Sequence, residues 1–160
     1  MASKKKKPAP TNIAAQNRKA RHNYTVLEEY EAGICLLGTE VKSLRKGGAN
    51  IVDSHADASD GEIFLLNSYI PEYNKTTMYK NHAPRRPRKL LLHKKEIKKL
   101  TGKVQEKGFT LIALDIHFNE KGIAKVKLGL CKGKSNYDKR ETEKNRDWDR
   151  KKARIMRGED

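Results

Sequence analysis

The fold is decided by residues 31–45, which read Glu31-Ala32-Gly33-Ile34-Cys35-Leu36-Leu37-Gly38-Thr39-Glu40-Val41-Lys42-Ser43-Leu44-Arg45. The first half holds three large aliphatic residues between two glycines, which is typical of a short buried strand that bends where glycine frees the backbone. Beyond the second glycine the apolar residues recur at a spacing of three, as on one face of a helix. We therefore expect a strand that leads directly into a short helix.

The predicted helix carries its apolar and its basic side chains on different faces. Val41 and Leu44 anchor one face, Thr39 is placed to cap the N-terminus, and a pair of glycines ends the run. Lys42 and Arg45 are also three residues apart, so the helix would hold two cations side by side. This pair is either a phosphate clamp or an ordinary solvated face, and the helix alone leaves both interpretations open.

The net charge of the whole chain favours a polyanionic partner. The 160 residues include 36 Lys or Arg and 20 Asp or Glu, which gives a formal charge of +16. The excess is concentrated in residues 1–22, 85–99 and 132–160, while the stretches rich in apolar residues are nearly balanced. Uniform basicity for solubility would not be distributed in this way, so we expect dedicated surfaces for nucleic acid.

Cysteine usage and hydropathy indicate a cytoplasmic protein. Cys35 and Cys131 each lie in an apolar stretch, which predicts two buried free thiols in a reducing compartment. No apolar run reaches the length of a membrane span, and the lysines near the N-terminus precede no hydrophobic signal core.

Alternating apolar residues predict a mostly β, antiparallel fold. Residues 24–37 should form the first strand, with a bulge at Gly33. Two hairpins follow: residues 50–58 and 62–70 are joined through Asp60-Gly61, and residues 109–118 and 123–130 through residues 119–122. About five strands with short helices fit an oligonucleotide-binding (OB) type of antiparallel β-barrel.

Two further segments complete the predicted folded domain, which we place at residues 17–131. Residues 71–87 form a long loop with tyrosines and arginines, either a nucleic-acid contact or a mobile excursion. Leu90-Leu91-Leu92 should enter a helix that continues through Leu100 and ends at Gly102.

Both ends of the chain differ from this domain in composition. Residues 1–16 are basic and broken by proline, which predicts a disordered arm. Residues 132–160 mix charges and have few apolar anchors, so we expect a tail that becomes helical only on a partner.

Nothing in the sequence indicates an enzyme, a metal site or a cofactor. The five histidines and two cysteines show no ligand spacing, and no Ser-His-Asp motif or nucleotide-binding glycine loop is present. Glu31 is an acid within a basic surface. It is either a solvent-facing strand residue or an acceptor for the amino groups of bases.

Five motifs occurring in register resemble the small protein B family of SsrA-binding proteins, which partner transfer-messenger RNA (tmRNA). They are residues 17–22, 31–34, 38–45 and 88–92 and the tail pair 132–134 and 138–140. The resemblance implies an OB-type barrel that binds the tRNA-like domain of tmRNA and delivers it, charged with alanine and alongside elongation factor Tu, to stalled bacterial ribosomes. It also implies that the tail enters the decoding site and the mRNA channel.

The resemblance and the basic pattern together give a set of predicted contact residues. The predicted RNA contacts are Asn17, Lys19, Arg21, His22, Glu31, Lys42, Arg45, Arg88, Leu91 and His93. The predicted ribosome contacts in the tail are Lys132, Lys134, Tyr137, Asp138, Lys139, Arg140, Ile155 and Met156.

The chain departs from the family pattern at three positions. Ser135 stands where many members have lysine, His55 where an aromatic residue is common, and His117 where tyrosine is common. A general ribosomal or cold-shock-like RNA-binding module would share the barrel and the charge, but it would not need the long tail.

Overall fold

The computed structural model describes residues 12–134 and 136–158. Its four α-helices and one 3₁₀ turn are α1 (Ala20–Asn23), α2 (Gly38–Lys46), α3 (Lys94–Gln105), α4 (Asn136–Met156) and η1 (Met78–Lys80). Its seven strands are β1 (Ile13–Gln16), β2 (Tyr24–Ile34), β3 (His55–Ser59), β4 (Glu62–Leu66), β5 (Arg88–Leu91), β6 (Phe109–Phe118) and β7 (Ala124–Gly133).

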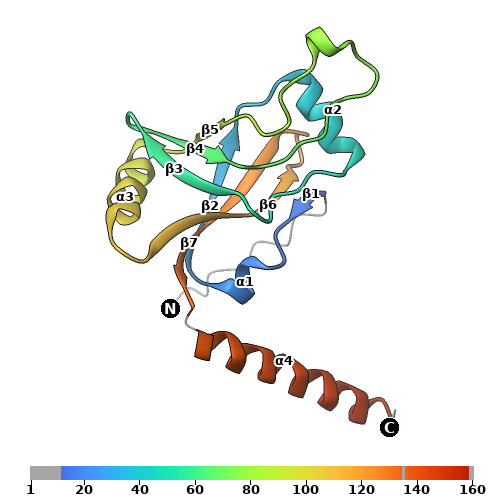
Figure 1. Cartoon of the computed structure of the whole chain (residues 1–160), viewed down its shortest axis with the longest axis vertical. Coiled ribbons are helices and arrows are strands. Elements are labelled where there is room, and N and C mark those ends of the chain that lie inside the picture. The colour runs from blue at the N-terminus through green and yellow to red at the C-terminus, as the bar shows by residue number, and fades with distance from the viewer. Residues whose placement is uncertain (1–11, 135, 159–160) are drawn as a thin grey trace.

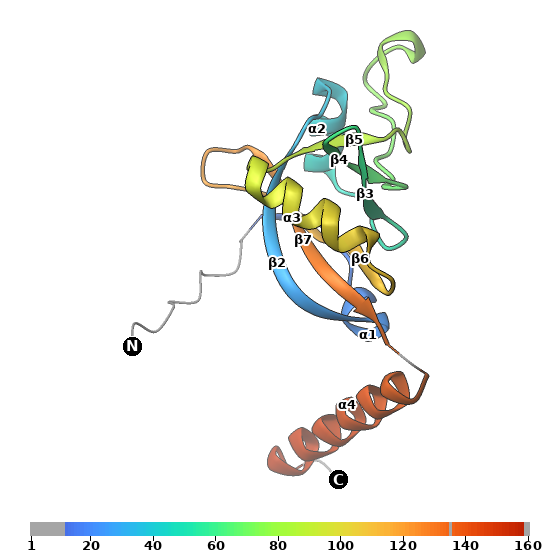
Figure 2. The same cartoon turned by 90° about the vertical axis from the view of Figure 1, so that its left-hand side faces the viewer.

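The strands form one antiparallel sheet that closes on itself. β6 pairs with β7, β7 with β2, β2 with β5, β5 with β4 and β4 with β3. The pairing of Ala56 in β3 with Leu111 in β6 completes the ring, and β1 joins the other half of the same edge of β6. Figure 2 shows the long curved strands β2 and β7 side by side. We call this closed sheet the β-ring; it confirms the predicted antiparallel fold, with seven strands instead of about five.

The inside of the β-ring is filled by aliphatic side chains. In β7, Val126 and Leu128 are fully buried, whereas the alternating residues Lys125 and Lys127 are only half-buried. The predicted alternation is therefore confirmed. Burying each such aliphatic side chain stabilises the fold by about 1.5–3 kcal/mol. The same core receives Leu44 from α2, so this helix is fixed to the ring through its apolar face.

The hairpin turn at Asp60-Gly61 is confirmed. Asp60 has φ 51° and Gly61 has φ 75°, the left-handed conformations that two-residue hairpin turns require. The first strand of this hairpin is shorter than expected, because Asn50 makes only an isolated bridge to Tyr69 and regular pairing begins at His55.

The predicted helix start at residues 90–92 was wrong. Arg88–Leu91 is strand β5, with Leu90 buried and Leu91 half exposed, so a short apolar run belonged to a strand and not to a helix. The helix α3 starts at Lys94, with His93 as its N-cap. It passes through Gly102 to Gln105; Gly102 is solvent-exposed and has open space around it.

The predicted bulge at Gly33 was also wrong. The register of β2 shifts between Val26 and Glu28, while Gly33 pairs regularly with both neighbouring strands. Gly33 is small for a different reason. A Cβ atom there would lie 3.1 Å from the Cβ of Leu91, so the residue makes room for that side chain.

The strand that was expected to reach Leu37 ends at Ile34, and this changes the environment of one thiol. Cys35 is exposed, in contradiction of the prediction that both thiols are buried, because it follows the end of β2. Cys131 is buried as predicted, and burial raises the pKa of its thiol to about 11.

The folded part also begins earlier than the predicted boundary at residue 17. Ile13–Gln16 forms β1, which pairs with β6, although these residues were assigned to the disordered arm. Residues 1–11 of that arm lie outside the described residues.

The C-terminal helix α4 extends away from the β-ring. It lies beyond α1, at the opposite end of the ring from α2 (Figure 1). Among the described residues, Glu143 of α4 lies 3.4 Å from His22, and Lys134, which follows β7, donates hydrogen bonds to the carbonyl oxygen of Arg21 and to the hydroxyl of Thr142 in α4. No helix in the described part of the chain has the length and apolar character that crossing a bilayer requires.

Candidate nucleic-acid interface

The outer face of β5, β2, β7 and β6 brings several predicted contact residues together. Because side chains alternate along a strand, Glu31 points outward from β2 while Ala32 is fully buried. The register places Glu31 opposite Lys127 of β7, which in turn lies opposite Asp115 of β6. We call this face of the β-ring, with residues Glu31, Leu91, Asp115, His117, Lys125 and Lys127, the sheet face.

Glu31 is held on the sheet face by a histidine that sequence reasoning missed. The Nε2 atom of His117 lies 3.1 Å from Oε1 of Glu31, and Nδ1 of His117 lies 2.6 Å from Oδ1 of Asp115. The side chains of His117 and Asp115 are 7% and 9% exposed, whereas that of Glu31 is 50% exposed. One carboxylate therefore faces solvent while the groups behind it are covered.

Leu91 is the last residue of β5 and belongs to the sheet face, and His93 follows it as the N-cap of α3. Leu91 is 51% exposed and lies opposite Gly33, two residues along β2 from Glu31. His93 is exposed at the start of α3, where its backbone N–H donates to Glu96 over 3.3 Å. An exposed leucine beside a carboxylate offers a stacking surface and an acceptor together.

The α1 segment continues this surface with cations. Lys19 and Arg21 are exposed, and Arg21 forms an ion pair of 2.6 Å with Glu29 on β2. Glu29 also lies 3.9 Å from Lys127, so the pairs connect α1 to the sheet face. His22 is half-buried, and its Nε2 atom faces Glu143 of α4.

Asn17 was predicted as an RNA contact, but it is buried and has a different role. Its amide nitrogen lies 3.2 Å from the carbonyl oxygen of Ala113, 3.4 Å from that of Val52 and 3.5 Å from that of Ile51, and its Oδ1 accepts from the N–H of Ala20. These contacts use both ends of the amide inside the protein. Asn17 therefore fixes the start of α1 against the ring.

Lys42 and Arg45 do not form the single clamp that their spacing suggested. The ammonium group of Lys42 lies 5.6 Å from the ring centre of Tyr73, which Lys46 also approaches at 4.9 Å. Arg45 turns the other way, over the ring of Phe118 at 5.3 Å. Cation–π contacts of this kind hold each cation in place while leaving it exposed to an anionic partner.

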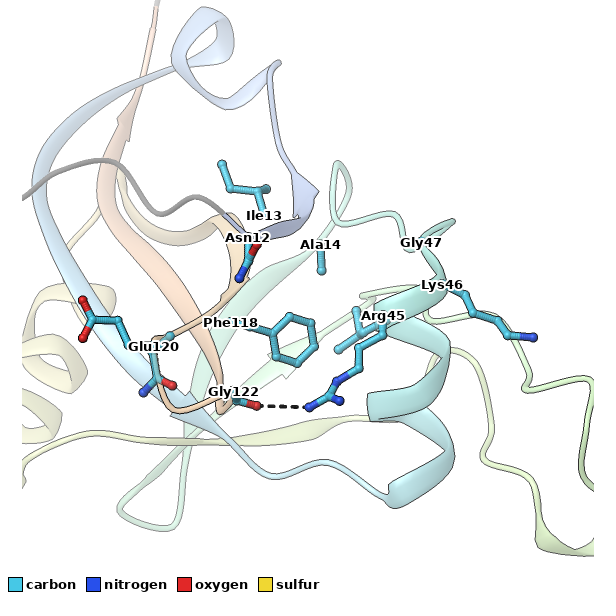
Figure 3. Close-up of a pocket in the computed structure, with 11 residues that line it drawn as sticks. Asn12, Ile13, Ala14, Arg45, Lys46, Gly47, Phe118, Glu120 and Gly122 are labelled. Atoms are coloured by element: carbon cyan, nitrogen blue, oxygen red, sulfur yellow. Dashed lines mark hydrogen bonds between the residues drawn. The ribbon is translucent and has the colours of Figure 1, made fainter.

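Arg45 borders an open hollow on the surface of the β-ring. This open cleft of about 540 Å³ lies between β1, the C-terminal end of α2 and the turn that joins β6 to β7 (Figure 3). The guanidinium of Arg45 reaches across to the carbonyl oxygen of Gly122 over 3.5 Å. Phe118 and Arg45 together present an aromatic ring and a planar cation to whatever enters, which suits a nucleobase or a phosphate.

Arg88 was predicted as an RNA contact and is completely buried instead. Its Nε donates to Glu40, which is also fully buried, and its Nη1 donates to the hydroxyl and the carbonyl oxygen of Ser68 at 2.8 and 3.0 Å. Glu40 further accepts from Arg86 and from the backbone N–H of Leu37. This network joins α2 to β5 and to the loop at residues 71–87, so it positions the cations of α2.

The charges of this network depend on one another. Burial raises the pKa of Glu40, but hydrogen bonds from Arg88, the Leu37 N–H and Arg86 outweigh it, so the pKa stays below the ordinary value of 4.5. Burial lowers the pKa of Arg88, and the hydrogen bond to Glu40 opposes this effect. Both groups therefore remain charged at neutral pH.

The loop at residues 71–87 is anchored to α2 along its length. The hydroxyl of Ser43 donates to the carbonyl oxygen of Pro71 over 2.5 Å. His82 is buried between the hydroxyl of Thr39 and the carbonyl oxygen of Ile70, both at 3.0 Å. Thr39 therefore binds this histidine and does not cap the helix as predicted; residue 37 takes that position. The tip of the loop presents Tyr79 fully to solvent.

The predicted ribosome contacts are divided between the ring and the helix. Lys132 belongs to β7 and Lys134 follows it, so the two lysines are attached to the ring. Residues 137–140 form the first turns of α4, where the side chains of Tyr137 and Asp138 lie outside the described residues. Ile155 and Met156 are 72% and 88% exposed near the far end of this helix.

A family model described as SmpB protein matches residues 14–158. The SsrA-binding protein of Afipia carboxidovorans is 54% identical over 152 residues, which cover 95% of this chain and 96% of the relative. That of Paramagnetospirillum magneticum is 57% identical over 148 residues, covering 92% and 96%. The solved structure "tmRNA-SmpB: a journey to the center of the bacterial ribosome" is similar with a TM-score of 0.64 and 57% identity, covering 76% of this chain and 84% of that one.

Proposed function

Because the chain belongs to the SmpB protein family, we propose that it binds tmRNA and acts with it on stalled bacterial ribosomes in trans-translation. It is a ribosome-associated RNA-binding protein that works in the cytoplasm, and it contributes binding, not catalysis. Elongation factor Tu as a further partner remains a prediction.

The sheet face and the α1 segment form the surface that binds the tRNA-like domain. The observation that carries this assignment is the half-exposed carboxylate of Glu31 on a rigid strand, next to an exposed leucine and within a rim of cations. Lysines and arginines supply affinity for any phosphate backbone, whereas a fixed carboxylate can accept hydrogen bonds from the amino groups of unpaired bases. Such a combination recognises one structured RNA in preference to nucleic acid in general.

The cations of α2 form a second, separate contact. α2 and α1 lie at opposite ends of the β-ring, and β2 runs between them (Figure 2). Lys42 and Arg45 therefore meet a different part of the RNA from the part that Lys19 and Arg21 meet. This arrangement requires a partner that spans the length of the ring, as a folded RNA does.

The C-terminal segment engages the ribosome. Its helix carries Trp148, Ile155 and Met156 in exposed positions, and residues 132–160 have a net positive charge. A basic helix with exposed apolar side chains gains by binding a surface of ribosomal RNA and protein. Its cations can pair with phosphates there, and its apolar groups are removed from water. We assign RNA capture to the ring and ribosome engagement to the helix.

A binding titration against matched RNAs tests the proposed function. The protein is mixed with the tRNA-like domain of tmRNA, with an RNA duplex of equal length and random sequence, and with single-stranded RNA, each at several salt concentrations. We expect a clear preference for the tRNA-like domain and a steep loss of affinity with salt, since about five phosphates are neutralised. Equal affinity for all three RNAs would contradict the proposal and favour a general RNA-binding module.

A further inference from the structure

A row of three ionisable side chains crosses the sheet face beneath the proposed RNA contact. Asp115 and His117 project from β6 and Glu31 projects from β2, with β7 between the two strands. The contacts run from Asp115 to Nδ1 of His117 at 2.6 Å and from Nε2 of His117 to Glu31 at 3.1 Å. The row therefore leads from a covered carboxylate through a covered imidazole to a half-exposed carboxylate.

The chemistry of the imidazole determines what this row does. Each ring nitrogen of His117 faces one carboxylate oxygen, Nδ1 that of Asp115 and Nε2 that of Glu31, and both distances are those of hydrogen bonds. A ring that is hydrogen-bonded through both nitrogens has a fixed orientation. Asp115, which is nearly covered, sets the orientation of the ring, and the ring then sets the position of Glu31.

The other charged groups on this face do not replace His117 in this role. Lys125 and Lys127 of β7 lie opposite His117 and Asp115 in the register. The ammonium group of Lys127 lies 3.9 Å from the carboxylate of Glu29. Within residues 12–134 and 136–158, the only ion pair of Glu31 is with His117, and it uses Oε1.

We propose that His117 and Asp115 are positioning residues, which hold Glu31 so that its Oε2 atom points to the bound RNA. This inference rests on the proposed function of the sheet face. A glutamate on a surface samples many rotamers, and fixing one of them before binding lowers the entropy cost of forming the contact. The row thus fixes the direction in which Glu31 can accept a hydrogen bond from an amino group of the RNA.

Two substitutions of His117 test this role. The side chains that they introduce differ by a single methylene group. The side-chain amide of His117→Gln extends far enough to replace the Nε2 donor and contact Glu31. The shorter amide of His117→Asn reaches Asp115 but stops short of Glu31. We expect His117→Asn to weaken binding of the tRNA-like domain about tenfold, and His117→Gln to restore it to within about threefold of the wild type.

The same two variants are also made in a Glu31→Ala background. There, His117→Asn should have no further effect on binding of the tRNA-like domain, because the residue that it positions is gone. In either background, affinity for the random duplex should stay unchanged. Thermal unfolding of each variant shows how much of any effect comes from loss of folded protein.

The possible outcomes separate this inference from the proposed function. Equal binding by His117→Asn and His117→Gln, or an equal loss from His117→Asn with and without Glu31, would overturn the positioning role. If His117→Asn weakens the random duplex as much as the tRNA-like domain, the residue is only structural and the inference is again overturned. A wild-type protein with no preference for the tRNA-like domain would instead overturn the proposed function.

Discussion

In the β-ring, Leu128 and its neighbours are shielded completely from water, whereas in α4 the large apolar side chains of Trp148, Ile155 and Met156 are mostly exposed. None of the described side chains of α4 is buried. The ring is therefore held by its own core. The helix is held by its backbone hydrogen bonds and by a few polar contacts near α1.

The packed ring and the exposed helix are suited to different kinds of partner. A surface that recognises RNA by the position of one carboxylate must be rigid before binding, and a packed core provides this rigidity. A helix with little packing can leave its place at a low cost in free energy, and its exposed apolar groups gain burial when a partner covers them.

Glu40→Gln should cost the most stability. The substitution leaves Arg88 as a buried charge without its partner, which costs about 3–5 kcal/mol of unfolding free energy. The matched control is Glu143→Gln in α4, which removes an exposed partner of His22 and should cost less than about 1 kcal/mol. Urea denaturation measures both values. Similar costs for the two variants would remove the contrast between ring and helix.

Acid should weaken the ring through the same carboxylate. The pKa of Glu40 is lower in the folded protein than its ordinary value of 4.5, because hydrogen bonds from Arg88, Leu37 and Arg86 outweigh the effect of burial. Its charge therefore stabilises the fold fully above the ordinary value, and this contribution is lost as pH falls through the lower folded-state pKa.

Urea denaturation across a pH series measures this loss. The difference in unfolding free energy between the wild type and Glu40→Gln should be constant above about pH 5 and should shrink below about pH 4. A difference that stays constant throughout would mean that Glu40 is not the acid-sensitive group.

Glu31→Ala and Lys42→Ala should affect RNA binding in different ways. Loss of the carboxylate should reduce the preference for the tRNA-like domain over a random duplex by about 1–3 kcal/mol. Loss of the lysine should weaken both RNAs alike and reduce the slope of log affinity against log salt by about one. Filter binding at several salt concentrations measures both effects. Identical profiles for the two variants would show that Glu31 is not a specificity residue.

Trp148→Ala should have the smallest effect on the free energy of unfolding, below about 0.5 kcal/mol, because this side chain is 56% exposed on α4. Leu128→Ala in the core is the reference and should cost about 2–5 kcal/mol. Thermal and urea unfolding followed by circular dichroism compare them. A large loss from Trp148→Ala would mean that α4 packs on the ring in solution.

Much of the ring could be predicted from the sequence, because local patterns determine it. The alternation in residues 124–130 and the Asp60-Gly61 turn act over a few residues, and the structure confirms both. The segment at residues 88–92 was assigned wrongly, since three consecutive leucines have no period and only pairing with β2 and β4 makes part of the segment a strand.

The candidate site was harder to predict, because burial depends on distant neighbours. Arg88 lies in a basic run and resembles a surface cation. It is buried because it donates a hydrogen bond to Glu40, which lies 48 residues away in the chain. Asn17 is buried for a similar reason. The one signal available for the row beneath Glu31 was the pair Asp115 and His117, two ionisable residues near the end of a mostly apolar strand.

A shortened chain that lacks α4 tests whether the ring binds RNA without the helix. The chain is cut after Lys134 and not at the predicted domain boundary, residue 131, because Lys132 and Gly133 pair with β2. The chain ending at Lys134 is compared with the full chain for affinity to the tRNA-like domain and for tagging of nascent chains on stalled ribosomes. We predict an affinity within about threefold of the full chain and loss of tagging. Loss of RNA binding, or tagging that persists without α4, would contradict the account.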